Sequence, residues 1–478
     1  MLAAAAAAAG LLYWFVSGDG VRLALERQAT AWLGQPVRIA TASAQILPRP
    51  AIRLGNVTVG EPVSLTLTSI VVSTDLRALI GGRLEAAELV VSDSRIRMPL
   101  PMARAATPAG GGSAGEPVRL VSIRSIALDN VRLMSRGREL VVNADSSLDG
   151  TRLTVRHFEA HGDGASLEAA GIVELSPRVD ATLRVKAALL DVDLLLALAE
   201  AFAPGADRRG SGPPPRVAAR VSAERARAGS LEVGQFATDL EVDGERVSLS
   251  PLTFQVFGGR YQGSISARLG ETLEASLRSR IIDLDVAQLA AFGGAAGAIS
   301  GTLTGAGTFT GRGADLAEVL RSARGDGTAS VVKGTIVRLN LIRTVVLFFG
   351  RPAPDAAAGT DTFERIDLRF TLADRVFGAQ ALSLQSRDAD IVGSGSLQTA
   401  SKALDGQLDL SLSEELSAQA GTDLQRYTRE GSRIVLPARL SGTLGQPRLS
   451  IDAAAAFQRG LRNDVERRLG DLLDRFAK

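Results

Sequence analysis

Two histidines, His157 and His161, flank Glu159 in "RHFEAHGDG" and are the only histidines of the chain. On a β-strand the residues i, i+2 and i+4 point to one face, so these three side chains are spaced as zinc ligands could be. The sequence offers no evident further ligand and no group that would orient the histidines. We therefore favour the simpler interpretation, in which they are polar residues on the solvent face of a strand, opposite Phe158 and Ala160, and we expect no metal site.

Pairs of aspartates end two strand-like segments, Asp191 with Asp193 in "LLDVDLLLAL" and Asp283 with Asp285 in "IIDLDVAQLA". Paired carboxylates can act as general acid and base or as calcium ligands. In both segments an apolar, helix-like run follows at once. Capping of a helix N-terminus is therefore the simpler role for these aspartates.

The glycine-rich stretch "GTLTGAGTFTGRG" (301–313) resembles a phosphate-binding loop only superficially. A dinucleotide fingerprint needs a strand, a turn and then a helix that starts at the last glycine. Here Gly301, Gly305, Gly307 and Gly311 punctuate a β segment, which indicates turns or bulges. The histidines are confined to one short stretch, so a Ser-His-Asp arrangement finds no support. We expect no enzyme and no cofactor.

Composition narrows the class of protein. The chain has 478 residues, of which 45% are hydrophobic and 22% charged, so the bulk is not a multi-span membrane protein. Aromatic residues make up only 4%, which is thin for a globule that fills its core with large rings. The absence of cysteine excludes disulfides and thiolate chemistry. A net charge of +2, with arginines scattered instead of clustered, argues against nucleic acid as a partner.

The elements that must position such groups are β-hairpins. In "YQGSISARLGETLEASLRSRI" (261–281), apolar or small residues alternate with polar ones on both sides of a turn at Gly270 and Glu271. The same plan recurs at 162–198 and 388–412, and partly at 434–452, so the chain contains a diverged hairpin repeat. Helical patterns are too few to cover a parallel sheet. We predict a mainly β fold: an elongated, twisted antiparallel sheet of serial hairpins, curled into an apolar groove, with short helices.

The N-terminal run "MLAAAAAAAGLLYWFV" is apolar and uncharged but, at about 24 Å as a helix, shorter than the roughly 30 Å hydrocarbon core. A cleaved signal peptide or an interfacial tail would also fit. We favour a membrane anchor whose first residues are missing from this chain. The predicted anchor residues are Leu11, Leu12, Tyr13, Trp14, Phe15 and Val16.

The predicted organisation has seven parts. A membrane anchor (1–17) precedes an N-terminal β region (18–100), which begins with a helical stripe of Val21, Leu25, Ala29 and Trp32. Pro/Gly-rich linkers at 101–117 and 351–361 flank a central β-repeat region (118–350). A C-terminal β-repeat region (362–452) leads to an amphipathic helix (453–478) with apolar residues on one stripe.

In this order the motifs resemble the AsmA family of bacterial envelope proteins. The resemblance rests on "LGQPVRIATASAQILPRPAIRLGNVTVGEP" after the anchor, the "IDLDV"-type strand ends, "GDGTASVVKGTIVRLNLI" and the closing "LSGTLGQPRLSID" with its helix. It implies an inner-membrane protein that extends into the periplasm and resembles bridge-like lipid transfer proteins. The implied partners are phospholipid, the inner membrane and proteins of the periplasm or outer membrane.

From the resemblance and the alternation together, we expect phospholipid binding and passive transfer toward the outer membrane. The alternative is a structural or regulatory factor in outer-membrane protein assembly that acts through edge strands. The residues expected to line the groove are the apolar members of the hairpins: Tyr261, Ile265, Leu269, Leu273, Leu277, Ile281, Val179, Leu183, Val185, Leu404, Leu408 and Leu410.

Overall fold

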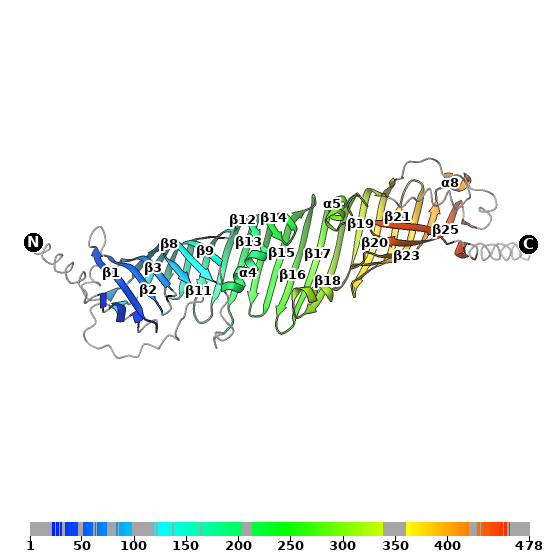
Figure 1. Ribbon diagram of the computed structural model, residues 1–478. Coiled ribbons are helices and arrows are strands. Elements are labelled where there is room, and N and C mark those ends of the chain that lie inside the picture. Colours follow the sequence, from blue (N-terminus) through cyan, green and yellow to red (C-terminus); the bar gives the residue numbers. More distant parts are fainter. Residues whose placement is uncertain are drawn as a thin grey trace, which may run out of the picture. The chain divides into compact units, whose positions relative to one another are not determined.

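The protein consists of two compact units, unit 1 (Met1–Gly244) and unit 2 (Glu245–Lys478). Both are mainly β with short helices, as predicted (Figure 1). The boundary between the two units lies within the predicted central β-repeat region (118–350). The computed structural model describes residues 22–23, 25–27, 29–30, 34–45, 51–60, 63, 65–73, 83–84, 86–97, 119–120, 123–135, 138–162, 165–202, 213–337, 360–419, 428–430, 432–452, 454–456 and 458.

Unit 2 is an antiparallel meander, in which each long strand pairs with the next one along the chain. Its long strands are β15 (Arg246–Val256), β16 (Gly259–Leu269), β17 (Leu273–Asp285), β18 (Thr302–Gly313), β19 (Arg324–Val337), β20 (Thr360–Ala373), β21 (Val376–Gln385), β22 (Ala389–Gln398), β23 (Leu404–Leu412), β25 (Arg433–Thr443) and β26 (Gln446–Ile451). The two-residue strand β24 (Arg429–Glu430) pairs with β25. In the part of unit 2 that the structure describes, three helices join strands: α5 (Val286–Phe292), α6 (Leu316–Arg321) and α8 (Glu414–Gln419).

The predicted hairpin at 261–281 is formed by β16 and β17. Tyr261 lies opposite Ile281, and Ile265 lies opposite Leu277, so the apolar members of both strands share one face. Cross-strand partners on one face of an antiparallel pair are close enough for their side chains to touch. The alternation in the sequence thus fixes the register, because a slip by one residue would turn every apolar side chain to the other face.

Capping by the Asp-x-Asp motifs is confirmed, at one aspartate of each pair. Asp285 begins α5, and its carboxylate accepts hydrogen bonds from the backbone N–H groups of Ala287 and Gln288. Asp191 does the same for α4 (Val192–Phe202), since it accepts from the backbone N–H of Leu194 at 3.0 Å. These bonds satisfy N–H groups that a helix leaves free in its first turn.

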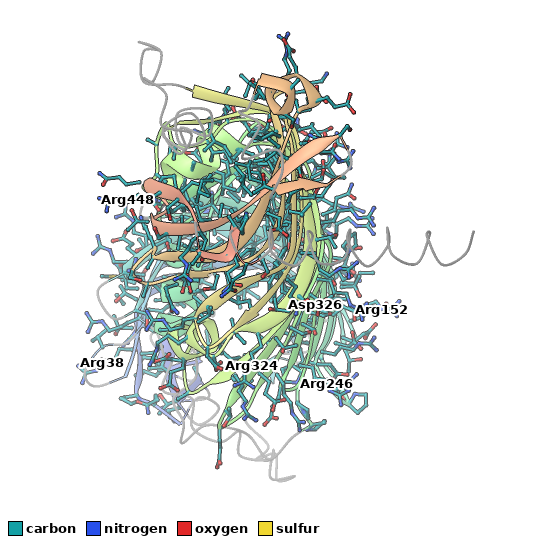
Figure 2. All side chains as sticks on the ribbon, turned by 90° about the vertical axis from the view of Figure 1, so that its right-hand side faces the viewer. Arg38, Arg152, Arg246, Arg324, Asp326 and Arg448 are labelled. Carbon is teal, nitrogen blue, oxygen red and sulfur yellow. The ribbon has the colours of Figure 1, made fainter. Side chains whose placement is uncertain are left out.

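Register shifts interrupt several strand pairs of unit 2. The pair β15–β16 shifts between Leu249 and Leu252, and the pair β17–β18 shifts between Ile281 and Leu284. A β-bulge bends its strand and increases the local twist. Seen end-on in Figure 2, the strands are curved, and arginine side chains, Arg246 among them, project from the sheet toward solvent.

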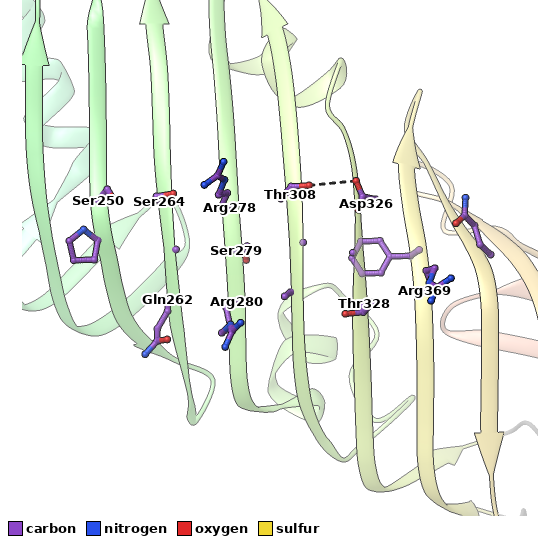
Figure 3. Close-up of a pocket in the computed structure, with 17 residues that line it drawn as sticks. Ser250, Gln262, Ser264, Arg278, Ser279, Arg280, Thr308, Asp326, Thr328 and Arg369 are labelled. Carbon is purple, nitrogen blue, oxygen red and sulfur yellow. Dashed lines mark hydrogen bonds between the residues drawn. The ribbon is translucent and has the colours of Figure 1, made fainter.

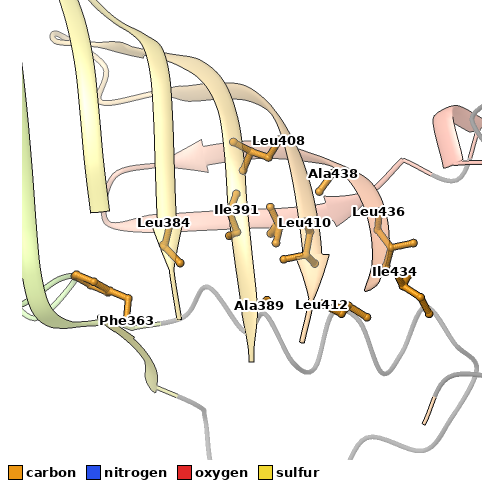
Figure 4. Packing of buried hydrophobic residues seen from close by; sticks show 11 residues of the cluster. Phe363, Leu384, Ala389, Ile391, Leu408, Leu410, Leu412, Ile434, Leu436 and Ala438 are labelled. Carbon is orange, nitrogen blue, oxygen red and sulfur yellow. The ribbon is translucent and has the colours of Figure 1, made fainter. Parts of the chain in front are cut away.

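A cluster of buried hydrophobic residues in unit 2 lies at its C-terminal strands (Figure 4). Leu410 on β23 pairs with Ile391 on β22 and with Leu436 on β25, and all three are at most 2% exposed. The strands β20 to β26 therefore enclose a fully buried cluster.

The chain enters the helix that follows β26 through Asp452, whose carboxylate accepts a hydrogen bond from the backbone N–H of Ala455 at 3.0 Å.

Unit 1 also consists mostly of sequential strands, and its longer hairpins again alternate apolar and polar residues. Its strands are β1 (Val37–Gln45), β2 (Ala51–Val59), β3 (Leu65–Ser73), β4 (Arg83–Leu84), β5 (Ala87–Ser92), β6 (Arg95–Arg97), β7 (Arg119–Leu120), β8 (Ile123–Ser135), β9 (Arg138–Asp149), β10 (Arg152–Gly162), β11 (Ala165–Glu174), β12 (Asp180–Asp191), β13 (Arg216–Ala228) and β14 (Leu231–Asp243).

The sheet of unit 1 is not purely antiparallel, which corrects the predicted fold class. Strand β13 runs parallel to β12, with Leu183 opposite Ala219. A parallel neighbour requires a connection that returns to the start of the preceding strand. The connection between β12 and β13 begins with α4, which directly follows β12. Strands β5 and β6 also pair in parallel with β8, as β4 does with β7.

A small core at the start of unit 1 includes part of the predicted helical stripe. Leu25 and Ala29 pack against the buried residues Val37, Ile39, Val57, Val59 and Ile70. The edge of β1 is hydrogen-bonded to the same helical segment, because Glu26 accepts from the N–H of Ile39 at 2.6 Å and Thr30 from that of Val37 at 3.0 Å. These hydrogen bonds give a partner to backbone N–H groups at the edge of the sheet, where no neighbouring strand would provide one.

Several predicted segments lie outside the described residues. They include the anchor (Leu11, Leu12, Tyr13, Trp14, Phe15 and Val16), the linker 101–117 and nearly all of the helix 453–478. Within the described ranges no helix is both long and apolar enough to cross a membrane. The predicted linker 351–361 overlaps β20, which already begins at Thr360.

Candidate functional site

One face of the sheet in unit 2 is apolar over successive strands. Cross-strand pairing carries one row from Ile265 through Leu277 and Phe309, and a second row from Tyr261 through Ile281. Most of these side chains are half-buried. We call this surface the apolar face of unit 2. Its large members on β15 to β21 include Phe254, Tyr261, Ile265, Leu269, Leu273, Leu277, Ile281, Leu303, Phe309, Val331, Ile366, Leu368, Phe370, Leu372, Phe377 and Leu382.

The structure brings the six predicted lining residues of the β16–β17 hairpin together on this face. They form three directly opposed pairs: Tyr261 with Ile281, Ile265 with Leu277 and Leu269 with Leu273. Leu269, next to the turn, is 50% exposed. An apolar row that ends in a half-exposed leucine offers surface to an apolar ligand, in contrast to a closed core.

The predicted lining residues on β23 are placed differently from one another. Leu404, Leu408 and Leu410 share the apolar face with the hairpin residues of β22. However, Leu408 is 7% exposed and Leu410 is 0% exposed, and both belong to the buried core cluster. These two leucines hold the C-terminal strands together and have no surface left for a ligand. Leu404 is half-buried.

In unit 1, Leu183 and Val185 lie on the apolar face of the β11–β12 hairpin. Leu183 is opposite Gly171, and Val185 is opposite Ala169. The third predicted residue, Val179, precedes β12 and is 42% exposed. The structure thus places Leu183 and Val185 on the sheet face as predicted, and Val179 at its end.

Glycines make room for aromatic rings on the apolar face of unit 2. A Cβ atom at Gly307 would lie 3.0 Å from the ring of Phe309, and one at Gly327 would lie 2.6 Å from the ring of Phe370. Because glycine has no side chain, the aromatic rings of the apolar face can lie directly over the backbone at Gly307 and Gly327.

Gly307 and Gly311 pair regularly within β18, so our prediction of turns or bulges was wrong for these two. It holds better for the others: Gly305 borders the register shift of the β17–β18 pair, and Gly301 precedes β18 with a φ of +132°.

The tyrosine on this face has one apolar and one polar neighbour. The Tyr261 ring stacks on Phe254 with the ring centroids 4.3 Å apart. Burial raises the pKa of Tyr261, and a hydrogen bond with Ser279 acts in the opposite direction. The phenol therefore stays neutral, and the side chain adds an apolar ring with one polar atom to this face.

The opposite face of unit 2 is polar and carries two shallow hollows. The first, of about 850 Å³, lies over β15 to β21, and Figure 3 shows Arg278, Arg280, Asp326 and Arg369 around it. The second, of about 860 Å³, adjoins it and shares Arg280 and Arg369. Both are within the size range of small-ligand sites. In the sequence, Arg278 and Arg280 are polar members of the alternating segment 261–281, which gives no sign of a hollow.

The three residues considered as zinc ligands lie on β10 of unit 1. The Nε2 of His157 is 3.9 Å and the Nδ1 of His161 is 3.5 Å from carboxylate oxygens of Glu159. The three side chains thus lie side by side on one face, and all are partly exposed. Across the described residues no group of three or more His, Asp or Glu side chains has the arrangement of a metal site.

Sequence reasoning missed the aromatic part of the apolar face. The rings of Phe370 and Phe377 stack with centroids 4.6 Å apart, and Phe309 lies 6.3 Å from Phe370. The available signal was the alternation around each phenylalanine, as in "GTFTG" and "LRFTL". Comparisons of the chain with protein-family models, with curated proteins and with solved structures give no match.

Proposed function

We propose that the apolar face of unit 2 binds the acyl chains of phospholipid, and that the protein passes phospholipid passively from the inner membrane toward the outer membrane. The observation that carries the proposal is the run of half-buried apolar side chains from β15 to β21, which includes Ile265, Leu277 and Phe309. The resemblance to AsmA proteins supports the envelope setting and the anchoring of the N-terminus in the inner membrane.

The chemistry of the face suits chains that move along it. Each CH₂ group of an acyl chain that leaves water contributes about 0.8 kcal/mol, wherever on the face it lies. This attraction has no preferred direction, so a chain can shift from Leu277 toward Phe309 without breaking hydrogen bonds. Headgroups would remain in water. In this mechanism the protein lowers the cost of exposing acyl chains and supplies no energy for the direction of transfer.

A vesicle assay tests the proposal. The variant Leu277→Glu places a carboxylate on the apolar face, whereas Thr310→Glu places one on the polar face of the adjacent strand. We expect transfer of fluorescent phospholipid between vesicles to fall at least about tenfold for Leu277→Glu, because a charge in contact with acyl chains is strongly disfavoured. Thr310→Glu should transfer like the parent protein.

The outcomes separate the possible roles of the face. Unchanged transfer by a folded Leu277→Glu protein would refute lipid binding here and would favour a scaffold that acts through protein contacts. Loss of the far-ultraviolet circular dichroism spectrum would show that the face is an ordinary core.

A further inference from the structure

Three arginines line the first hollow on the polar face of unit 2: Arg278 and Arg280 on β17, and Arg369 on β20 (Figure 3). Among the described residues, none of the three forms an ion pair. Five other arginines in the described part of unit 2 have a carboxylate oxygen within 3.8 Å, and further ones, such as Arg246 and Arg260, have none. The five pairs are Arg268 with Glu245, Arg321 with Glu318, Arg324 with Asp374, Arg365 with Asp367 and Arg433 with Asp390. The hollow therefore gathers cations whose charge is not neutralised by a neighbour.

The lining of the hollow is cationic as a whole. It contains three arginines and a single carboxylate, that of Asp326, which gives a formal charge of +2. Asp326 accepts a hydrogen bond from the hydroxyl of Thr308 at 3.5 Å, the outer limit of such a bond. The remaining polar lining consists of neutral donors and acceptors: Ser250, Gln262, Ser264, Ser279, Thr308, Thr328 and Gln380.

Small side chains form the floor between the arginines. Arg280 on β17 pairs with Ala306 on β18, Ala306 with Thr328 on β19, and Thr328 with Arg369 on β20. Two strands, each with a short side chain at this level, therefore lie between the two arginines. At about 4.8 Å between strands, the backbones of Arg280 and Arg369 are roughly 14 Å apart. Long guanidinium side chains from both sides can meet an anion above this floor, and Arg278 lies two residues along the same strand.

We propose that this hollow is a binding site for a small, soluble anion that carries phosphate groups, of the size of pyrophosphate. Guanidinium groups bind phosphate through two parallel hydrogen bonds, and three of them suit an anion with several charges. The volume of about 850 Å³ is that of a small-molecule site. An extended anionic membrane fits poorly, because Glu274 on β17 and Asp367 in the adjoining hollow would face it on the same surface.

This site is separate from the one proposed for acyl chains. The sheet lies between the two, since Arg278 and Leu277 are consecutive residues of β17 and point to opposite faces. Either proposal can therefore fail without the other.

Titration calorimetry of the whole chain with pyrophosphate at low ionic strength tests the site. We expect a dissociation constant below about 1 mM. The substitutions Arg280→Gln and Arg369→Gln should each weaken binding by about three- to tenfold, as expected for one exposed charge near the anion. Because all three arginines are exposed, the variants should keep the circular dichroism spectrum of the parent.

Two further variants sharpen the test. Asp326→Asn removes the one carboxylate of the lining and should tighten binding by about threefold. Arg365→Gln, on the same strand as Arg369 but already paired with Asp367, should leave the affinity unchanged. Absence of pyrophosphate binding would overturn the proposal, as would equal effects of Arg369→Gln and Arg365→Gln. Binding to phosphatidylglycerol vesicles without binding to pyrophosphate would also contradict it and would assign the surface to a membrane.

Discussion

Two leucines on the same face of unit 2 differ in what covers them, and truncating each to alanine should reveal the difference. Leu410 is 0% exposed within the core cluster, whereas Leu277 is half-buried on the apolar face. Leu410→Ala removes buried methylene and methyl groups and leaves a cavity, which costs about 3 kcal/mol. Leu277→Ala opens no closed cavity and gives up about half of the transfer free energy, about 1 kcal/mol.

Urea denaturation followed by far-ultraviolet circular dichroism measures both values. Tryptophan fluorescence is unsuited, because both tryptophans, Trp14 and Trp32, precede unit 2. For a unit of this size, each kcal/mol corresponds to about 2–4 °C in Tm, so Leu410→Ala should lower Tm by about 6–12 °C. Equal destabilisation by the two substitutions would refute the distinction, since it would mean that Leu277 is enclosed as Leu410 is.

Three further predictions concern caps, pH and glycine. Asp285→Ala removes the acceptor for the N–H groups of Ala287 and Gln288 and should destabilise α5 by about 1 kcal/mol, seen as faster hydrogen exchange across residues 286–292; unchanged exchange would contradict the cap. For Asp191, hydrogen bonds from the Leu194 N–H and then from Arg227 hold its pKa below the ordinary value of 3.8. The stability that ionised Asp191 contributes is therefore present above pH 3.8 and is lost as the pH falls through the lower pKa of the folded state. Asp191→Asn should remove this part of the acid dependence. If the free energy of unfolding falls equally steeply below pH 4 in the parent and the variant, the prediction is wrong. Gly327→Ala would set a Cβ 2.4 Å from the carbonyl oxygen of Ala306 and 2.6 Å from the Phe370 ring, which should cost about 1–3 kcal/mol in urea denaturation. Gly445→Ala, with no atom within 4 Å, is the matched control and should stay within about 0.5 kcal/mol of the parent.

The hairpins could be predicted because their information is local. Alternation from Tyr261 to Ile281 and a glycine at the turn together determine the strands, the face and the register. The same holds for the caps, since Asp191 and Asp285 each stand directly before an apolar helical run. These features depend on neighbours within a few residues.

Features that depend on distant strands could not be predicted. Alternation places Leu277 and Leu410 on one face but says nothing of what lies above them, so the closure of the core around Leu410 had no local signal. The parallel pairing of β13 with β12 requires a crossover between them, whereas the Pro/Gly-rich composition of 203–215 is typical of a plain linker. The hollow likewise combines arginines of β17 and β20, which lie about ninety residues apart.

Acyl-chain binding by the apolar face is tested most directly with a photo-crosslinking side chain at Ile265 and, separately, at Ser266. These consecutive residues of β16 lie on opposite faces: Ile265 is opposite Leu277, and Ser266 is opposite Ser276. We predict that irradiation in phospholipid vesicles captures lipid at position 265 and leaves position 266 free. Equal capture at both positions, or capture at neither, would contradict the proposal that this face holds acyl chains.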